Sequence, residues 1–306
     1  MRTGYPALAA LLIVLAVSAG LLMRRASAPA EKAEGGLRVV TTLFPLYDMA
    51  SAIGGGRAEV SMLLPPGMEP HSFEPRPGDM ARLERADIFV YTGSSMEPWA
   101  GDLVRASANR ELLAVDAGRD IVRAAGPSGG APDPHIWLDF DNAKVMARTI
   151  ADAFQTKDPE NAEAYRRAAA QYVEKLSALD LSYRNGLARC RTRNIVYGGH
   201  YAFAYMARRY GLEYSSAQGI SPDSEPTARD LAALVEQIRR EKIKSVFYEE
   251  LASPKIAETV ARETGAGMLM LNAAHNVSRD QLRDGVTFFD ILGSDLAALR
   301  EGLECR

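Results

Sequence analysis

Residues 159–187, PENAEAYRRAAAQYVEKLSALDLSYRNGL, form one uninterrupted helical pattern near the middle of the 306-residue chain. No proline follows the first residue of this stretch, and its glycine comes only near the end. The apolar residues recur every three or four positions, which predicts a single buried stripe along a helix. At about 1.5 Å per residue this helix is about 40 Å long, which is nearer the length of a two-domain protein than of one lobe. The stripe consists of Tyr165, Ala168, Ala169, Tyr172, Leu176, Leu179 and Tyr183.

On both sides of this helix, apolar runs of strand length alternate with amphipathic stretches. Such alternation predicts βαβ units and parallel sheets. We therefore expect an α/β protein with two Rossmann-like (βα)4-type lobes, residues 37–157 and 191–306, joined by a rigid linking helix at 158–190. The expected strands are residues 37–44, 58–64, 87–92, 112–115, 136–138, 194–197, 212–216, 245–248 and 268–271.

The first 28 residues resemble an export signal. Arg2 precedes an apolar run over residues 5–23, and Ala28 fits a small-residue cleavage site. The run is nearly long enough to span a bilayer and is followed by two arginines, so an uncleaved membrane anchor is the alternative. No cysteine follows the run, which excludes lipid attachment there, and residues 29–36 are expected to form a tether. The sequence thus predicts a periplasmic protein, cleaved or anchored at its N-terminus.

Charge and cysteine content narrow the function further. The net charge of −3 gives no electrostatic support for nucleic-acid binding. Cys190 and Cys305 are the only cysteines, and in an exported chain such a pair favours a disulfide. Two unpaired thiols are the alternative.

The four histidines all fall at the ends of expected strands. They cover the chain from residue 71 to residue 275, so only the fold can bring them together. Ligands of open α/β sheets bind outside the carboxyl ends of strands, which predicts a site in the cleft between the lobes. Four neutral imidazoles at one point would bind zinc, whereas histidines that stay apart would be ordinary core or surface residues. The four are His71 and His135 in the first lobe and His200 and His275 in the second.

Four motifs around these residues resemble the zinc- and manganese-binding solute-binding proteins of ABC importers. Their order and their division between the lobes match that family. The resemblance implies two lobes on a rigid backbone helix, and a receptor, not an enzyme, that hands one Zn²⁺ per chain to a separate ABC permease and its ATPase. A monomer is expected. The motifs are PPGMEPHSFEPRPGD (65–79), DPHIWLDFDNA (133–143), VYGGHYAFAYMARRYGL (196–212) and SEPTARDLAALVEQIRREKIKSVFYEELASPKIAETVARETGA (224–266).

The same resemblance assigns site residues. His71, His135 and His200 match the family's three nitrogen-ligand positions, and a histidine at the third favours zinc, where manganese-type members often have glutamate. Many relatives place a carboxylate after the last strand, but residues 271–276, LNAAHN, hold none. His275 is the candidate fourth ligand, with Asn272 or a water as alternatives.

Four carboxylates near the motifs are candidates to orient the metal-bound imidazoles, because such rings usually donate their second N–H to a carboxylate or carbonyl. Helix capping and surface ion pairs are the alternatives. The candidates are Glu74, Asp139, Glu225 and Glu249.

Other functions are compatible with part of the pattern. The main alternative is a receptor for manganese or another divalent metal. A zinc hydrolase would use three histidines and an open fourth position to activate water, but no HExxH helix is present and His275 would close that position. A surface adhesin or a periplasmic zinc chaperone on the same fold would share these residues.

Overall fold

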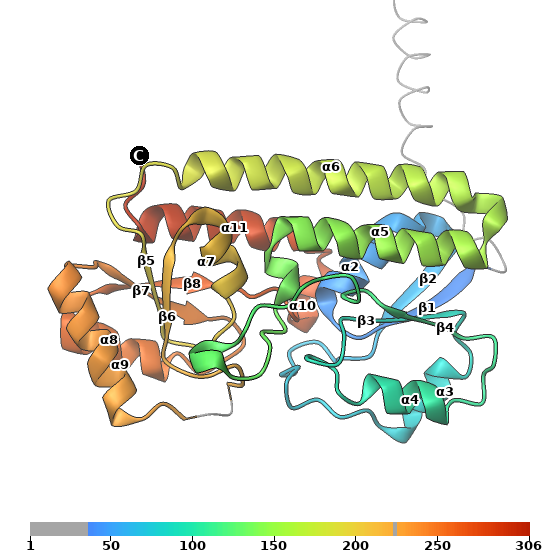
Figure 1. Ribbon diagram of the computed structural model, residues 1–306, viewed down its shortest axis with the longest axis horizontal. Helices are drawn as coiled ribbons and strands as arrows, with labels where there is room; N and C mark the ends of the chain where they lie inside the picture. Colours follow the sequence, from blue (N-terminus) through green and yellow to red (C-terminus); the bar gives the residue numbers. More distant parts are fainter. Residues whose placement is uncertain (1–35, 223–224) are drawn as a thin grey trace, which may run out of the picture.

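The computed structural model describes residues 36–222 and 225–306, which form two α/β lobes under one long helix (Figure 1). Each lobe contains a four-stranded parallel sheet, in the order β2-β1-β3-β4 in the first and β6-β5-β7-β8 in the second. The predicted fold class is confirmed. The strands are β1 (Leu37–Thr41), β2 (Ala58–Met62), β3 (Ile88–Tyr91), β4 (Leu113–Asp116), β5 (Asn194–Tyr197), β6 (Glu213–Ser216), β7 (Ser245–Glu249) and β8 (Gly267–Leu271).

Helices connect the strands and cover the sheets, as expected for βαβ units. Among the described residues, single 3-10 turns also occur: η1 (Gly55–Arg57), η2 (Pro127–Gly129), η3 (Ile136–Leu138) and η4 (Pro159–Asn161). The α-helices are α2 (Phe44–Gly54), α3 (Pro77–Leu83), α4 (Ala100–Ala106), α5 (Phe140–Lys157), α6 (Ala162–Gly186), α7 (Ala204–Tyr210), α8 (Ala228–Glu241), α9 (Lys255–Thr264), α10 (Arg279–Arg283) and α11 (Phe288–Gly302).

The export signal expected at residues 1–28 and nearly all of the tether expected at 29–36 lie outside the described residues. Within residues 36–222 and 225–306, no helix combines the length and the apolar character needed to cross a bilayer.

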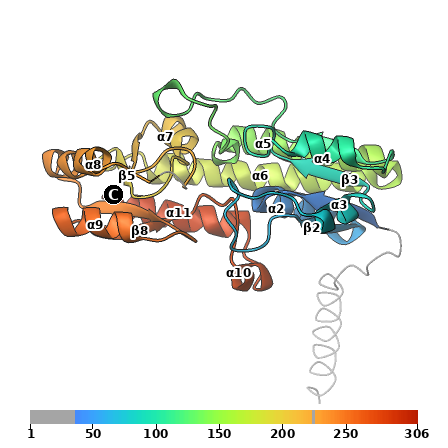
Figure 2. The same ribbon diagram turned by 90° about the horizontal axis from the view of Figure 1, so that it is seen from below.

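Helix α6 extends over both lobes and packs on each of them (Figures 1 and 2). Its buried face includes most of the predicted stripe and lies against α2 and α5 of the first lobe and α11 of the second. Two buried tyrosines bond it to the two lobes: near its middle the Tyr172 hydroxyl donates to Asp48 on α2 (2.7 Å), and near its C-terminal end the Tyr183 hydroxyl donates to the carbonyl of Leu292 on α11 (2.6 Å). Because its contacts are shared by both lobes, bending α6 would break packing in each of them.

The prediction of a strand at residues 136–138 is wrong. These residues form the single 3-10 turn η3, with Leu138 N–H donating to the His135 carbonyl (3.2 Å). The segment is completely buried, and in the described part of the chain it pairs with no strand of either sheet. Asp139 caps α5 directly afterwards, so the chain must turn here to enter that helix.

Cys190 and Cys305 form the expected disulfide, with a sequence separation of 115 residues. The two cysteines also face each other in an isolated antiparallel bridge. The bond therefore connects the chain just after α6 to the chain just after α11.

Opening this disulfide should destabilise the protein. A closed loop of this length corresponds to up to about 4.7 kcal/mol of unfolded-state entropy, and about 2–4 kcal/mol is usual in practice. Denaturant unfolding with and without reductant measures the difference. In the double variant Cys190→Ser/Cys305→Ser, reductant should have no effect. Equal unfolding free energies for the oxidised and reduced wild type would contradict this expectation.

Candidate metal centre

The second lobe presents two of its site residues where its strand order reverses. In the order β6-β5-β7-β8 that point lies between β5 and β7, and ligands of open α/β sheets bind outside the carboxyl ends of such strands. His200 follows β5 after two glycines, and Glu249 is the last residue of β7. A Cβ on Gly199 would lie 2.8 Å from Glu249 Oε2, so only glycine allows this close approach.

The other three histidines reach the same point from separate loops. His71 lies between β2 and α3, His135 directly before η3, and His275 in the loop after β8. Among the described residues the histidines thus come together from both lobes, as the sequence predicted for the cleft.

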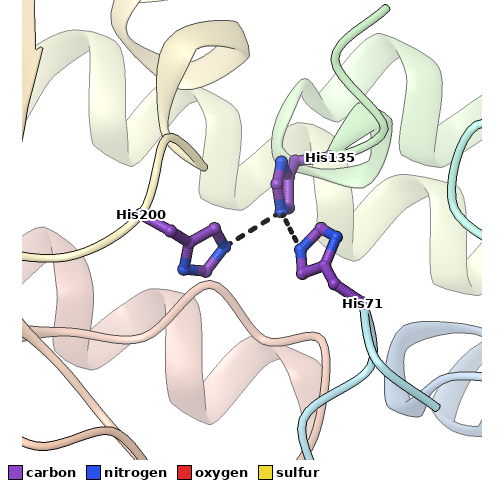
Figure 3. A group of neighbouring side chains, drawn as sticks. All are labelled: His71, His135 and His200. Atoms are coloured by element: carbon purple, nitrogen blue, oxygen red, sulfur yellow. Dashed lines mark hydrogen bonds between the residues drawn. The ribbon is translucent and has the colours of Figure 1, made fainter. Parts of the chain in front are cut away.

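Three of the imidazoles converge through their Nε2 atoms (Figure 3). His135 Nε2 lies 3.2 Å from His71 Nε2 and 3.2 Å from His200 Nε2. Two nitrogens bound tetrahedrally to one zinc at about 2.0–2.1 Å are about 3.3 Å apart. The spacing of the side chains therefore matches the ligand sphere of a single zinc ion.

Two buried carboxylates fix the tautomers of these rings. His135 Nδ1 lies 2.8 Å from Asp133 Oδ1, and His200 Nδ1 lies 2.8 Å from Glu249 Oε2. Each of these oxygens also accepts the backbone N–H of its histidine, so it acts as an acceptor and each Nδ1 carries the proton. Both Nε2 atoms are then left with lone pairs that face each other. A cation between them would turn this repulsion into two bonds.

Burial disfavours the charged form of three of the four imidazoles. Burial, and then the neighbouring His200, lowers the pKa of His71 to about 3. Burial, followed by the neighbouring histidines, also holds the pKa values of His135 and His275 well below the usual range. His71, His135 and His275 are therefore neutral near pH 7, which is the form that binds metal.

His275 completes the arrangement on the side of the second lobe. Its ring is buried, stacks on His200 at a centroid distance of 5.5 Å and lies 6.3 Å from the rings of His71 and His135. Neither ring nitrogen has a hydrogen-bond partner, although Nε2 lies 3.9 Å from Glu249 Oε1. Asn272, the alternative ligand, is held by its own loop, since its Oδ1 accepts the Ala274 N–H (2.8 Å).

Hydrogen bonds between the lobes hold the ligand loops in register. The Asn276 amide donates to the carbonyls of Pro65 (2.9 Å) and Met68 (2.7 Å), in the loop that leads to His71. On the other side of the site, Trp137 Nε1 donates to the Ala273 carbonyl (2.8 Å). Each bond joins a residue next to one histidine to a loop that carries another.

The four candidate orienting carboxylates differ in what they contact. Glu249 hydrogen-bonds His200, as described above. Asp139 instead caps α5 and pairs with Arg209 (2.7 Å), which also contacts Asp180 on α6. Glu74 and Glu225 are exposed, and neither hydrogen-bonds a histidine among the described residues.

Sequence reasoning missed Asp133, which contacts His135. The sequence does contain a pattern that indicates this contact. A carboxylate two residues before a histidine, in a segment bounded by prolines, can accept both the backbone and the ring N–H of that histidine. Together, His71, His135 and His200 form a group able to hold a metal ion, and His200, Glu249 and His275 form another.

A cluster of histidines and carboxylates able to hold a metal ion, between two α/β lobes with parallel sheets joined by one long helix, is typical of a metal-type solute-binding protein. The chain belongs to the ZnuA family, described as zinc-uptake complex component A, periplasmic, whose model matches residues 39–302.

Named relatives agree with this assignment. The chain is 32% identical over 280 residues to the high-affinity zinc uptake system protein ZnuA of Bacillus subtilis, covering 87% of this chain and 88% of that protein. It is 32% identical over 290 residues to the zinc-binding protein AdcA of Streptococcus pyogenes serotype M18, covering 88% of this chain. It spans only 56% of the length of that AdcA.

A solved relative has the same fold. The Zn(II)-bound ZnuA-like domain of Streptococcus pneumoniae AdcA superposes with a TM-score of 0.77 at 32% identity, covering 88% of this chain and 100% of that one. That structure contains Zn(II).

Acid should destabilise the metal-free protein partly through His71. Its folded pKa of about 3 lies below the ordinary value of 6.5, so between these values the unfolded chain binds a proton that the folded chain does not. Stability is therefore lost as the pH falls from about 6.5 towards about 3. Thermal unfolding of the wild type and His71→Asn, both metal-free, measures the contribution of His71 to this loss of stability. The wild type should lose stability relative to the variant on acidification, and a constant difference between about pH 7.5 and about pH 4.5 would contradict it.

Proposed function

We propose that this chain is an extracytoplasmic high-affinity receptor that binds Zn²⁺ and delivers it to an ABC importer. The observation that carries the proposal is the pair of Nε2 lone pairs on His135 and His200, held 3.2 Å apart by buried carboxylates. This arrangement is unfavourable without a cation and has the spacing of a zinc site. The ZnuA and AdcA relatives, whose names state zinc binding or uptake, support the choice of metal.

We assign His71, His135, His200 and His275 as the four ligands of one ion per chain. The first three supply nitrogens at zinc-like spacing. His275 is the fourth because its buried ring nitrogens have no other partner, whereas the Asn272 side chain is engaged in its own loop. Asp133 and Glu249 fix the ring tautomers and supply negative charge beside the ion. A nitrogen sphere favours zinc over manganese, which prefers oxygen ligands.

The remaining parts of the proposal follow from the family. The lobes are residues 37–157 and 191–306 with a linking helix at 158–190, and the receptor is a periplasmic monomer whose partners are a separate permease and ATPase. Binding and release, with no catalytic turnover, are its whole activity, because His275 faces the position that a hydrolase would leave open for water. Rigid α6 limits the accompanying motion to small shifts of the lobes and loops.

Zinc should bind with one ion per chain and much more tightly than manganese, because nitrogen-rich sites follow the Irving–Williams order. Competition with a coloured chelator measures both affinities, and elemental analysis of protein purified without added metal identifies the native ion. Manganese that competes on equal terms with zinc would contradict the proposal.

His275→Ala should weaken zinc binding by at least about tenfold, or about 1.4 kcal/mol, yet leave it measurable, since three imidazoles remain. His275→Asp should restore part of this loss by supplying an oxygen ligand, and His200→Ala should cost at least as much as His275→Ala. The same chelator competition compares the variants. An unchanged zinc affinity in His275→Ala would show that another group completes the sphere.

A further inference from the structure

We propose that a cavity beside β8, α10 and α11 binds a small primary amine as its ammonium ion, and that Asp295 receives the ammonium group. The cavity has a volume of about 410 Å³. This volume lies in the range of small-molecule sites and exceeds the space of a single water. None of the four histidines lines the cavity, so it is separate from the candidate metal centre. The inference does not depend on the proposed function.

The buried side chain of Asp295 is the first observation that points to a ligand. Asp295 lies on α11, lines the cavity and is 3% exposed. Its Oδ1 accepts the backbone N–H of Asn272 (2.9 Å), in the loop that follows β8. Its Oδ2 is buried and has no hydrogen-bond partner. Because buried carboxylate oxygens are normally hydrogen-bonded, Oδ2 is the atom available to a donor in the cavity.

The charge of the cavity wall favours a cationic ligand. In the described part of the chain, no lysine or arginine lines the cavity. Asp290 is a second lining carboxylate, and the Thr287 hydroxyl, which donates to it (2.6 Å), holds its pKa below the usual value. Asp290 is therefore ionised at neutral pH. Burial raises the pKa of Asp295 well above its usual range, and an ammonium ion beside Oδ2 would stabilise the ionised form.

The free atoms and the apolar wall narrow the class of cation. Only one oxygen of Asp295 is free, which fits a single N–H of an ammonium group, whereas a guanidinium binds carboxylates best through both oxygens. Among the described residues, the groups of three or more side chains able to hold a metal ion all lie at the histidine centre, which argues against a metal ion here. A short hydrocarbon chain fits the apolar part of the wall, formed by Met270, Val286, Ile291 and Ala298.

Titration of the metal-free protein with n-butylamine and n-butanol tests the site, because the two probes differ in the ammonium group and share the hydrocarbon chain. Calorimetry should give a dissociation constant of about 1 mM or tighter for n-butylamine, at least about tenfold tighter than for n-butanol. Met270 lines the cavity and reports the location of binding. In protein labelled with ¹³C at the methionine methyl groups, n-butylamine should shift the Met270 signal, which Met270→Leu assigns.

Three variants separate the charge of Asp295 from the space of the cavity. Asp295→Asn keeps an oxygen for the Asn272 N–H and should weaken n-butylamine binding at least about tenfold. Asp280→Asn removes the same charge from an exposed residue of α10 outside the cavity wall, and should change the affinity by less than about twofold. Ala298→Leu fills the cavity without changing its charge and should weaken binding of both probes. Circular dichroism and thermal unfolding confirm that each variant folds.

Four results would each overturn the amine site. They are equal affinities for n-butylamine and n-butanol, a Met270 signal that n-butylamine does not shift, an unchanged affinity in Ala298→Leu, and a loss in Asp280→Asn as large as that in Asp295→Asn. Ala298→Leu tests the cavity even if Asp295→Asn does not fold. Zinc affinity is measured separately, so failure of the amine site leaves the proposed function unaffected.

Discussion

The facing lone pairs of His135 and His200 are the constraint on which the rest of the site depends. Two neutral rings 3.2 Å apart, each with its proton held on Nδ1 by a buried carboxylate, repel each other in the absence of a cation. The fold keeps them together because each ring belongs to a different lobe and neither lobe can withdraw alone. Packing keeps both rings buried and close together in the metal-free protein, at a cost in free energy. Binding of an ion offsets this cost, so the metal-free site is already arranged for its ligand.

Three kinds of contact fix the lobes relative to each other. Along one side, α6 is bonded to both lobes through Tyr172 and Tyr183. Across the cleft, the Asn276 amide holds the loop that leads to His71. Beside α6, Arg209 joins α7 to the start of α5. A wide hinge would have to break all three at once, so entry of an ion depends on local movement of the ligand loops.

The sequence predicted the parts of the structure that depend on local periodicity. The long helix and the alternating strands follow from spacing alone, and the histidines follow because strand ends of parallel sheets share an edge. The apolar run at 136–138 is too short to show a period, and in the structure it turns into α5, whose N-cap is Asp139. The sequence also could not show which candidate carboxylate orients a histidine, because Glu249 meets His200 and Asp139 meets Arg209 through tertiary contacts.

The disulfide between Cys190 and Cys305 makes the second lobe a covalent ring. His200 and His275 both lie on this ring, on opposite arcs from its closing bond. A single protease cut anywhere inside it releases no fragment, and the two pieces remain one molecule that carries both histidines. In a compartment that contains proteases, one cut in this lobe therefore leaves His200 and His275 in the same molecule. Without the disulfide, a cut between them would place them on separate pieces.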